Sequence, residues 1–172
     1  WSNNIYNFED VLQVGCVLNT FVRRSDVVKI ACIAQLVNVI APIMTVPGGG
    51  VWRQSIFYPY LYASIYGRGE ALDLKVNSPG YKAKYSDDTP YLDVSGVHND
   101  DGHLSFFIVN RNPSETLDVD VSLQGFDASD IVEHLMIKHD DLKATNSIDD
   151  PNNIVPQKGA GATLAGGNLS LQ

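Results

Sequence analysis

The residues of this chain best suited to acid–base or nucleophilic chemistry are its four glutamates, Glu9, Glu70, Glu115 and Glu133. Two facing carboxylates can hydrolyse a glycosidic bond, at a separation of about 5 Å when the reaction retains configuration. We expect Glu9 at the start of a helix, Glu70 at a junction between two structural regions, and the other two in or beside strands. No two of them are predicted to converge, so the sequence assigns no catalytic residue.

The four histidines, His98, His103, His134 and His139, are possible metal ligands. His98 and His103 flank a predicted hairpin turn, but no third ligand of suitable type and spacing accompanies them. Residues 48–50 are glycines without the Lys-Ser/Thr of a phosphate-binding loop, and the chain has no Gly-x-Ser-x-Gly nucleophile motif. The sequence therefore predicts neither a metal nor a cofactor.

Two amides, Gln35 and Asn38, lie beside a run of aliphatic residues that we interpret as a buried strand over residues 36–41. A buried amide must be hydrogen-bonded, because an unpaired one costs about 1–3 kcal/mol. Either both amides bond to neighbouring backbone, or one of them points into a substrate pocket beside the strand. The spacing alone leaves both interpretations open.

The elements that must position these residues belong to a chain of 172 residues, with 12 Lys and Arg against 20 Asp and Glu and a formal net charge of −8. The basic residues are scattered, whereas nucleic acids and anionic membranes require clustered positive charge, so neither is an expected partner. The longest apolar stretch, residues 27–47, is interrupted by Lys29, Gln35 and Asn38, and we do not expect it to span a membrane.

The first residues, beginning at Trp1, have no signal-peptide layout, and we expect the chain to come from the inside of a longer protein. Cys16 and Cys32 both fall in predicted helices, and their spacing matches neither a metal pair nor a disulfide framework. We expect both thiols to be reduced, buried and inert.

Residues 1–67 show mainly helical periodicity. The predicted elements are a helix capped by Asn7 and ending at Arg23 and Arg24, a short helix over residues 26–34, the strand over 36–41, a flexible loop over 47–50, and a helix over 52–66 bent or broken by Pro59. One buried parallel strand needs parallel neighbours that this segment does not contain. We therefore interpret residues 1–67 as the end of an α/β sheet or barrel whose other strands lie elsewhere.

Residues 68–172 alternate with the period of two that is typical of strands. The expected strands cover residues 72–76, 91–98, 103–110, 117–123 and 131–138, followed by a long polar loop over 139–161 and a last, unfinished strand from residue 168. Residues 99–102 have the composition of a hairpin turn. The alternation predicts an antiparallel sandwich or barrel as a second domain.

Residues 29–45 and 52–59 closely resemble the α-L-arabinofuranosidases of glycoside hydrolase family 51, most specifically in the run Ala-Gln-Leu-Val-Asn-Val-Ile-Ala-Pro-Ile. The resemblance extends upstream to residues 6–12 and downstream to 89–93, 109–111, 133–134 and 139–146. It implies an α/β then all-β fold, with the last strand and helices of a (β/α)8 barrel in residues 1–67 and an antiparallel β-sandwich in residues 68–172.

The same resemblance implies a retaining hydrolase that removes terminal α-L-arabinofuranosyl groups from arabinan or arabinoxylan oligosaccharides. Its two catalytic glutamates precede the segment that matches this chain, so the isolated chain is expected to be inactive. The family's sugar-binding glutamine corresponds to Gln35, whereas Asn38 is assigned no role beyond structure. We also expect the chain to have the remainder of the barrel as a partner, to form a homo-oligomer and to lie in the cytoplasm.

A second interpretation is a non-catalytic module, in which the sandwich binds carbohydrate or a partner subunit and the helical part is a remnant. Tyr91, Phe106, Phe107 and Phe126 offer no obvious exposed platform, because all four suit a core as well. Binding of arabinan by isolated residues 68–172 would favour this alternative.

Overall fold

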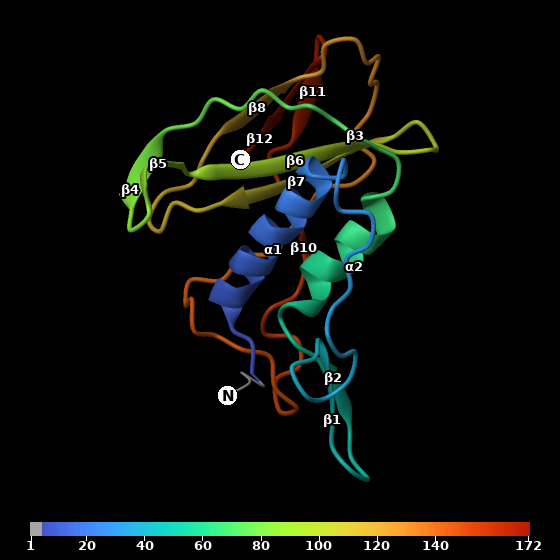
Figure 1. Ribbon diagram of the computed structural model, residues 1–172, viewed down its shortest axis with the longest axis vertical. Coiled ribbons are helices and arrows are strands. Elements are labelled where there is room, and N and C mark those ends of the chain that lie inside the picture. Colours follow the sequence, from blue (N-terminus) through green and yellow to red (C-terminus); the bar gives the residue numbers. More distant parts are fainter. Residues whose placement is uncertain (1–4) are drawn as a thin grey trace.

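The computed structural model describes residues 5–172, which form helices and short strands joined by long irregular segments (Figure 1). The helices are α1 (Phe8–Arg23) and α2 (Phe57–Tyr66). The strands are β1 (Ile43–Thr45), β2 (Val51–Arg53), β3 (Glu70–Ala71), β4 (Gly80–Ala83), β5 (Ser86–Pro90), β6 (Leu92–His98), β7 (Leu104–Asn110), β8 (Val119–Ser122), β9 (Leu135–Met136), β10 (Gln157–Lys158), β11 (Thr163–Ala165) and β12 (Asn168–Leu171). Neither helix is long and apolar enough to cross a membrane.

Helix α1 begins and ends where the sequence predicts. The Asn7 side chain accepts a hydrogen bond from the Asp10 N–H, and the Asp10 carboxylate accepts one from the Asn7 N–H, which together form a capping box. At the other end the Arg24 N–H bonds to the Thr20 carbonyl. The apolar side of α1 contacts β6, β7 and α2, so this helix joins the two halves of the chain.

The helix expected over residues 26–34 is not formed. A single turn follows α1, in which the Val28 N–H bonds to the Arg24 carbonyl, and the chain then continues without regular structure to residue 36. Valine and isoleucine at positions 27, 28 and 30 lose side-chain freedom in a helix, and the side chains of Val27 and Ile30 are exposed, so no packing compensates for that loss.

The strand expected over residues 36–41 is not formed either, and this segment makes only an isolated parallel bridge between Val37 and Ile43. A parallel strand is stable when neighbouring strands and covering helices bury it, and residues 5–172 provide no such neighbours. The side chains of Leu36, Val37 and Val39 consequently remain at the surface, whereas Ala41 is buried.

The glycine-rich loop is the tip of an antiparallel hairpin formed by β1 and β2, with Met44 opposite Trp52. Trp52 therefore lies in a strand, and the helix expected over 52–66 begins at Phe57 instead. Pro59 does not bend α2, because it occupies the first turn, where a backbone N–H has no partner within the helix.

The second half is rich in antiparallel strands, as expected. β6 pairs with β7 over seven residues and with β3 on its other side, and the turn at residues 99–102 uses Gly102 at φ +88°. β12 pairs with both β8 and β11, so it is the central strand of its sheet. In Figure 1 these two sheets lie above the helices.

Three details of the strand prediction are wrong. Residues 72–76 form no strand, because only the Leu72 N–H bonds to β6, at the Gly96 carbonyl. The strand expected over 131–138 is reduced to β9, which pairs with β10. The β4–β5 hairpin was not expected, because its second strand, Ser86–Pro90, has almost no apolar residues.

The polar loop expected over residues 139–161 is interrupted by β10, and its earlier part packs against the start of α1. The Phe8 and Glu9 N–H groups bond to the carbonyls of Ala144 and Leu142, both at 3.0 Å. Ile154 from this loop is fully buried in a cluster with Phe8 and Val11. The first and second halves of the chain therefore share a core.

Gly15→Ala is expected to lower the free energy of unfolding by about 1 kcal/mol, although alanine favours helices by a similar amount. A Cβ at this position would lie 2.9 Å from Cγ2 of Val109, so α1 would have to move away from β7. Urea denaturation checks the change. In a Val109→Ala background the same substitution should stabilise the protein, and destabilisation there would contradict the close-contact explanation.

Candidate functional site

Gln35 lies in the irregular segment between α1 and β1, with its side chain exposed. No residue within 5–172 hydrogen-bonds to its amide. Leu36, Val37 and Val39, which follow it, are 62%, 44% and 51% exposed. Successive exposed aliphatic side chains are typical of a surface that further polypeptide or a ligand covers. The Gln35 amide is therefore available to a partner outside the described residues.

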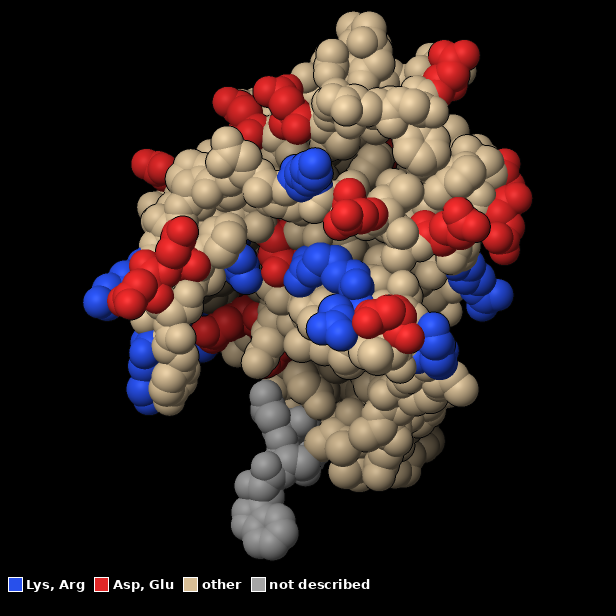
Figure 2. Space-filling model, turned by 45° about the horizontal axis from the view of Figure 1, so that its top comes forward, with Lys and Arg blue, Asp and Glu red and all other residues tan. Residues whose placement is uncertain are grey.

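The segment that carries Gln35 is uncharged as well as apolar. No charged residue occurs between Lys29 and Arg53 in the sequence. Figure 2 shows acidic and basic side chains interspersed over the upper part of the molecule, while the lower right of this face shows neither kind. Such a surface suits contact with neutral groups, whether protein or ligand.

The second amide of the pair, Asn38, has a structural role, as the sequence interpretation assigned it. Its Oδ1 accepts a hydrogen bond from the Thr45 N–H at 2.8 Å, and its Nδ2 lies 3.0 Å from the Thr45 Oγ1. The Asn38 N–H also bonds to the Ile43 carbonyl at 2.8 Å. The two amides therefore differ: Asn38 is occupied within the chain and Gln35 is not.

A third amide, Gln54, was missed by the sequence analysis. It is 2% exposed, accepts a hydrogen bond from the Tyr6 N–H, and donates one to the Ala41 carbonyl. The adjacent Ser55 hydroxyl lies within hydrogen-bond distance of the Tyr6 and Asn7 carbonyls. The signal available in the sequence is a Gln-Ser pair directly before an apolar helix, where side chains often satisfy backbone groups.

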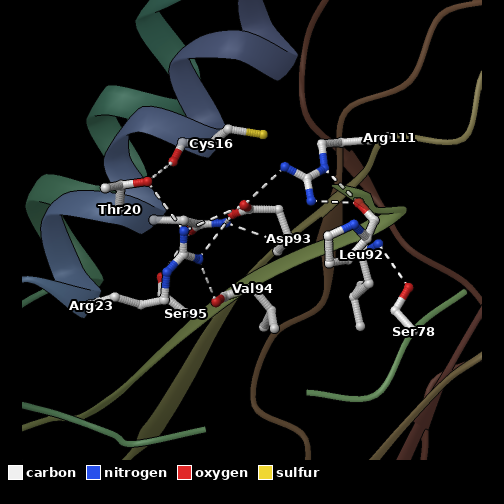
Figure 3. Close-up of polar contacts among 11 residues, drawn as sticks. Cys16, Thr20, Arg23, Ser78, Leu92, Asp93, Val94, Ser95 and Arg111 are labelled. Atoms are coloured by element: carbon white, nitrogen blue, oxygen red, sulfur yellow. Dashed lines mark hydrogen bonds and ion pairs between the residues drawn. The ribbon is translucent and has the colours of Figure 1, made fainter. Parts of the chain in front are cut away.

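The most connected polar cluster of the described residues joins α1 to β6 (Figure 3). The Asp93 Oδ1 accepts hydrogen bonds from Asn19 Nδ2 at 2.9 Å and Arg23 Nη1 at 3.0 Å, and its Oδ2 lies 3.4 Å from Arg111 Nη1. Ser95 donates to the Asn19 Oδ1 at 2.8 Å. A carboxylate as buried as Asp93 requires such partners, so this cluster holds the helix on the sheet.

The cysteines differ from the expectation that both are buried in helices. Cys16 lies in α1 and is partly buried, and burial, together with the nearby Asp93 carboxylate, raises the pKa of its thiol. It is therefore a poor nucleophile at neutral pH. Cys32 is exposed, because the helix expected around it is absent. Neither forms a disulfide within residues 5–172.

The glutamates lie on different elements, with separate contacts. Glu9 pairs with Lys143 beside the start of α1. The Glu133 carboxylate accepts a hydrogen bond, at 2.8 Å, from the hydroxyl of Tyr66, the last residue of α2. This bond raises the pKa of the Tyr66 hydroxyl. Glu115 lies 3.3 Å from the Asn112 amide after β7, and Glu70 lies in β3. None of these contacts joins two carboxylates into the pair that a glycosidase requires.

The histidines also have separate surroundings. His103 lies 2.9 Å from the Asp101 carboxylate, which together with the backbone bond lowers the pKa of Asp101. His98 packs edge-on against Phe126, and His139 bonds locally to Asp141. Within residues 5–172 no group of three His, Cys, Asp or Glu side chains is arranged to hold a metal ion.

The chain belongs to the α-L-arabinofuranosidase C-terminal domain family, whose family model matches residues 2–172. The match includes both halves of the chain and the buried Asp93 cluster that joins them.

Curated relatives include two proteins named intracellular exo-α-(1→5)-L-arabinofuranosidase. The Bacillus subtilis protein is 45% identical over 168 residues, which is 97% of this chain and 33% of the relative. The Halalkalibacterium halodurans protein is 48% identical over 144 residues, which is 83% of this chain and 29% of the relative. The chain thus spans about a third of the length of these relatives.

Solved structures agree on the fold. A family 51 α-L-arabinofuranosidase from Bifidobacterium longum matches 97% of this chain and 33% of its own chain, with a TM-score of 0.87 at 29% identity. The enzyme of the same family from Xanthomonas axonopodis matches 97% of this chain and 34% of its own, also with a TM-score of 0.87, at 23% identity.

Asp93→Asn is expected to lower the free energy of unfolding by about 2–4 kcal/mol, because Arg23 and Arg111 would lose the carboxylate that neutralises them in a largely buried setting. Urea denaturation provides the measurement. The matched control is Asp87→Asn, which breaks an ion pair with Lys82 whose side chains are 89% and 80% exposed and should change stability by less than about 0.5 kcal/mol. Equal effects of the two substitutions would contradict the assignment.

Proposed function

We propose that this chain is the C-terminal part of a retaining α-L-arabinofuranosidase, and that Gln35 binds the terminal arabinofuranosyl group of the substrate. The observation that carries the proposal is the Gln35 amide, exposed and without a partner in residues 5–172, within an uncharged segment of a chain that belongs to the arabinofuranosidase family. An amide suits a sugar because it donates to one oxygen and accepts from a hydroxyl.

In this proposal the substrates are arabinan or arabinoxylan oligosaccharides, from which single terminal residues are released. The relatives' names describe exo-acting enzymes, which supports release from a chain end. The two catalytic carboxylates come from the polypeptide that this chain lacks relative to those proteins. One would act as nucleophile and the other as general acid and base.

We further propose that residues 1–67 contribute the last strand and outer helices of a (β/α)8 barrel. The exposed Leu36, Val37 and Val39 support this, because parallel strands on either side would bury them. In a barrel of this kind the active site lies at the carboxyl ends of the strands. Homo-oligomer formation stays a prediction, and an intracellular location is proposed from the relatives' names.

Gln35→Ala in the full-length enzyme is expected to lower kcat/KM for an aryl α-L-arabinofuranoside by the equivalent of about 1–3 kcal/mol, because the sugar loses hydrogen bonds in a desolvated site. Steady-state kinetics give the measurement. Gln124→Ala, which truncates an exposed glutamine in the turn after β8, serves as the control and should leave kcat/KM unchanged. Unchanged kcat/KM in the Gln35 variant would contradict the proposed role of Gln35 in sugar binding.

The isolated 172-residue chain is expected to hydrolyse no aryl α-L-arabinofuranoside, because none of its glutamate contacts pairs two carboxylates. The measurement combines intact mass with an activity assay on the same preparation. Turnover by a preparation containing only the 18.8 kDa species would contradict the proposal that the catalytic carboxylates lie elsewhere.

A further inference from the structure

The β1–β2 hairpin is fastened directly to the segment that carries Gln35. Val37, two residues after Gln35, forms a parallel bridge with Ile43 in β1. The Asn38 N–H donates to the Ile43 carbonyl at 2.8 Å, and the Asn38 side chain bonds to both the N–H and the hydroxyl of Thr45. The start of the hairpin therefore cannot move without moving residues 37 and 38.

The reversal that brings the hairpin back to residue 37 uses an unfavourable backbone. Asn38 has φ +67° and Ile40 has φ +47°, and within residues 5–172 they are the only non-glycine residues with positive φ. Asparagine tolerates this conformation, whereas isoleucine, which is branched at Cβ, is strained by about 1–3 kcal/mol. Strained residues persist where the surroundings hold them, and they cluster at functional sites.

The base of the hairpin is held from its second strand as well. Asn146 is 3% exposed, and its Nδ2 donates to the Arg53 carbonyl at 3.0 Å. Gln54 donates to the Ala41 carbonyl through its side chain and to the Pro42 carbonyl through its N–H, both at 2.8 Å. Buried amides thus fix the base, while the tip projects from the body of the molecule (Figure 1).

We infer that the β1–β2 hairpin forms the wall of the substrate site that receives the part of the glycan beyond the terminal sugar, and that Asn38 is the positioning residue that holds this wall beside Gln35. The inference rests on the proposed function, since it uses Gln35 to locate the terminal sugar. It makes the hairpin a determinant of specificity for the glycan chain, which is not part of the role of Gln35.

The chemistry of the hairpin matches a neutral glycan. The one charged side chain of the hairpin is Arg53 at the base, whose guanidinium lies over the Phe57 ring. Residues 43–52 carry no charge, and Val46 and Val51 near the tip are 40% and 66% exposed. A neutral oligosaccharide presents C–H groups to apolar walls. It carries no charge that a residue of the wall would have to neutralise. A rigid base lowers the entropy cost of ordering the wall around a substrate. An exo-acting enzyme needs such a wall on one side of the terminal sugar only.

The test compares two substrates of the full-length enzyme: α-(1→5)-linked arabinotriose, which extends beyond the terminal sugar, and α-L-arabinofuranosyl azide, which does not reach the hairpin. Asn38→Gly keeps the backbone conformation accessible and removes the bonds to Thr45. It should raise KM for arabinotriose about fivefold and leave kcat and KM for the azide within about twofold. Asn38→Asp, which retains the acceptor for the Thr45 N–H, should restore most of the arabinotriose KM.

Val51→Ser probes the wall itself, because Val51 is exposed and its replacement leaves the hairpin bonds intact. It should raise KM for arabinotriose alone, whereas Val132→Ser, at a valine that is 75% exposed beside Glu133, should change neither substrate. Equal losses on both substrates, or no loss in either hairpin variant, would overturn the inference.

Gln35→Ala separates the inference about the hairpin from the proposed function. This variant should impair hydrolysis of both substrates, and its failure to do so would count against the proposed function instead. If Asn38→Gly does not fold, Val51→Ser decides alone.

Discussion

The buried carboxylate of Asp93 is the interaction on which the remainder of this structure depends. A charge in this position is tolerated only because Asn19 and Arg23 from α1, and Arg111 from beyond β7, all bond or pair with it. Since these partners come from both halves of the chain, α1 can occupy only one position on the sheet. The position of α1 then fixes where the residues before Phe8 and after Arg23 lie.

The consequences extend along the chain to the candidate site. Once α1 is fixed, its first residues lie against Ser55, whose hydroxyl meets the Tyr6 and Asn7 carbonyls. Gln54, next in sequence, bonds to the Ala41 carbonyl at the end of the segment that carries Gln35. Polar contacts at both ends of α1 therefore link the sheet to the segment that carries Gln35. Those at Ser55 and Gln54 each use a side chain to satisfy a backbone carbonyl.

Local signals explain which parts of the fold could be predicted. The capping residues of α1 and the turn between β6 and β7 act over three or four residues, and both elements appear where the sequence indicates. Residues 26–41 form neither the predicted helix nor the predicted strand, and residues 5–172 supply no parallel strands that would bury this segment. Their composition is suited to burial, as the exposed Ile30 and Leu36 show, at 83% and 62%. Tertiary context decides such segments, and composition alone cannot supply it.

The candidate site shows the same division between residue type and environment. Gln35, Asn38 and Gln54 are chemically similar, yet one is exposed, one closes a strained reversal and one is buried. Only the partners distinguish them. The Tyr6 N–H that meets Gln54 lies 48 residues away in the sequence, and no local pattern records such a contact. The resemblance to a family identified Gln35, whereas the bonds that tie the hairpin to the segment carrying Gln35 are evident only in the structure.

These contacts also weigh against an autonomous sandwich module. Ile154, which is fully buried, lies in a cluster with Phe8 and Val11. The Asn146 amide donates a hydrogen bond to the Arg53 carbonyl. Separation of residues 68–172 would expose Ile154 to water and leave a buried amide without that acceptor, and both changes are unfavourable. The same loop, residues 139–154, therefore supports the second strand of the hairpin from the sandwich side. Residues 68–172 thus brace the hairpin, although their glutamate contacts join no pair of carboxylates.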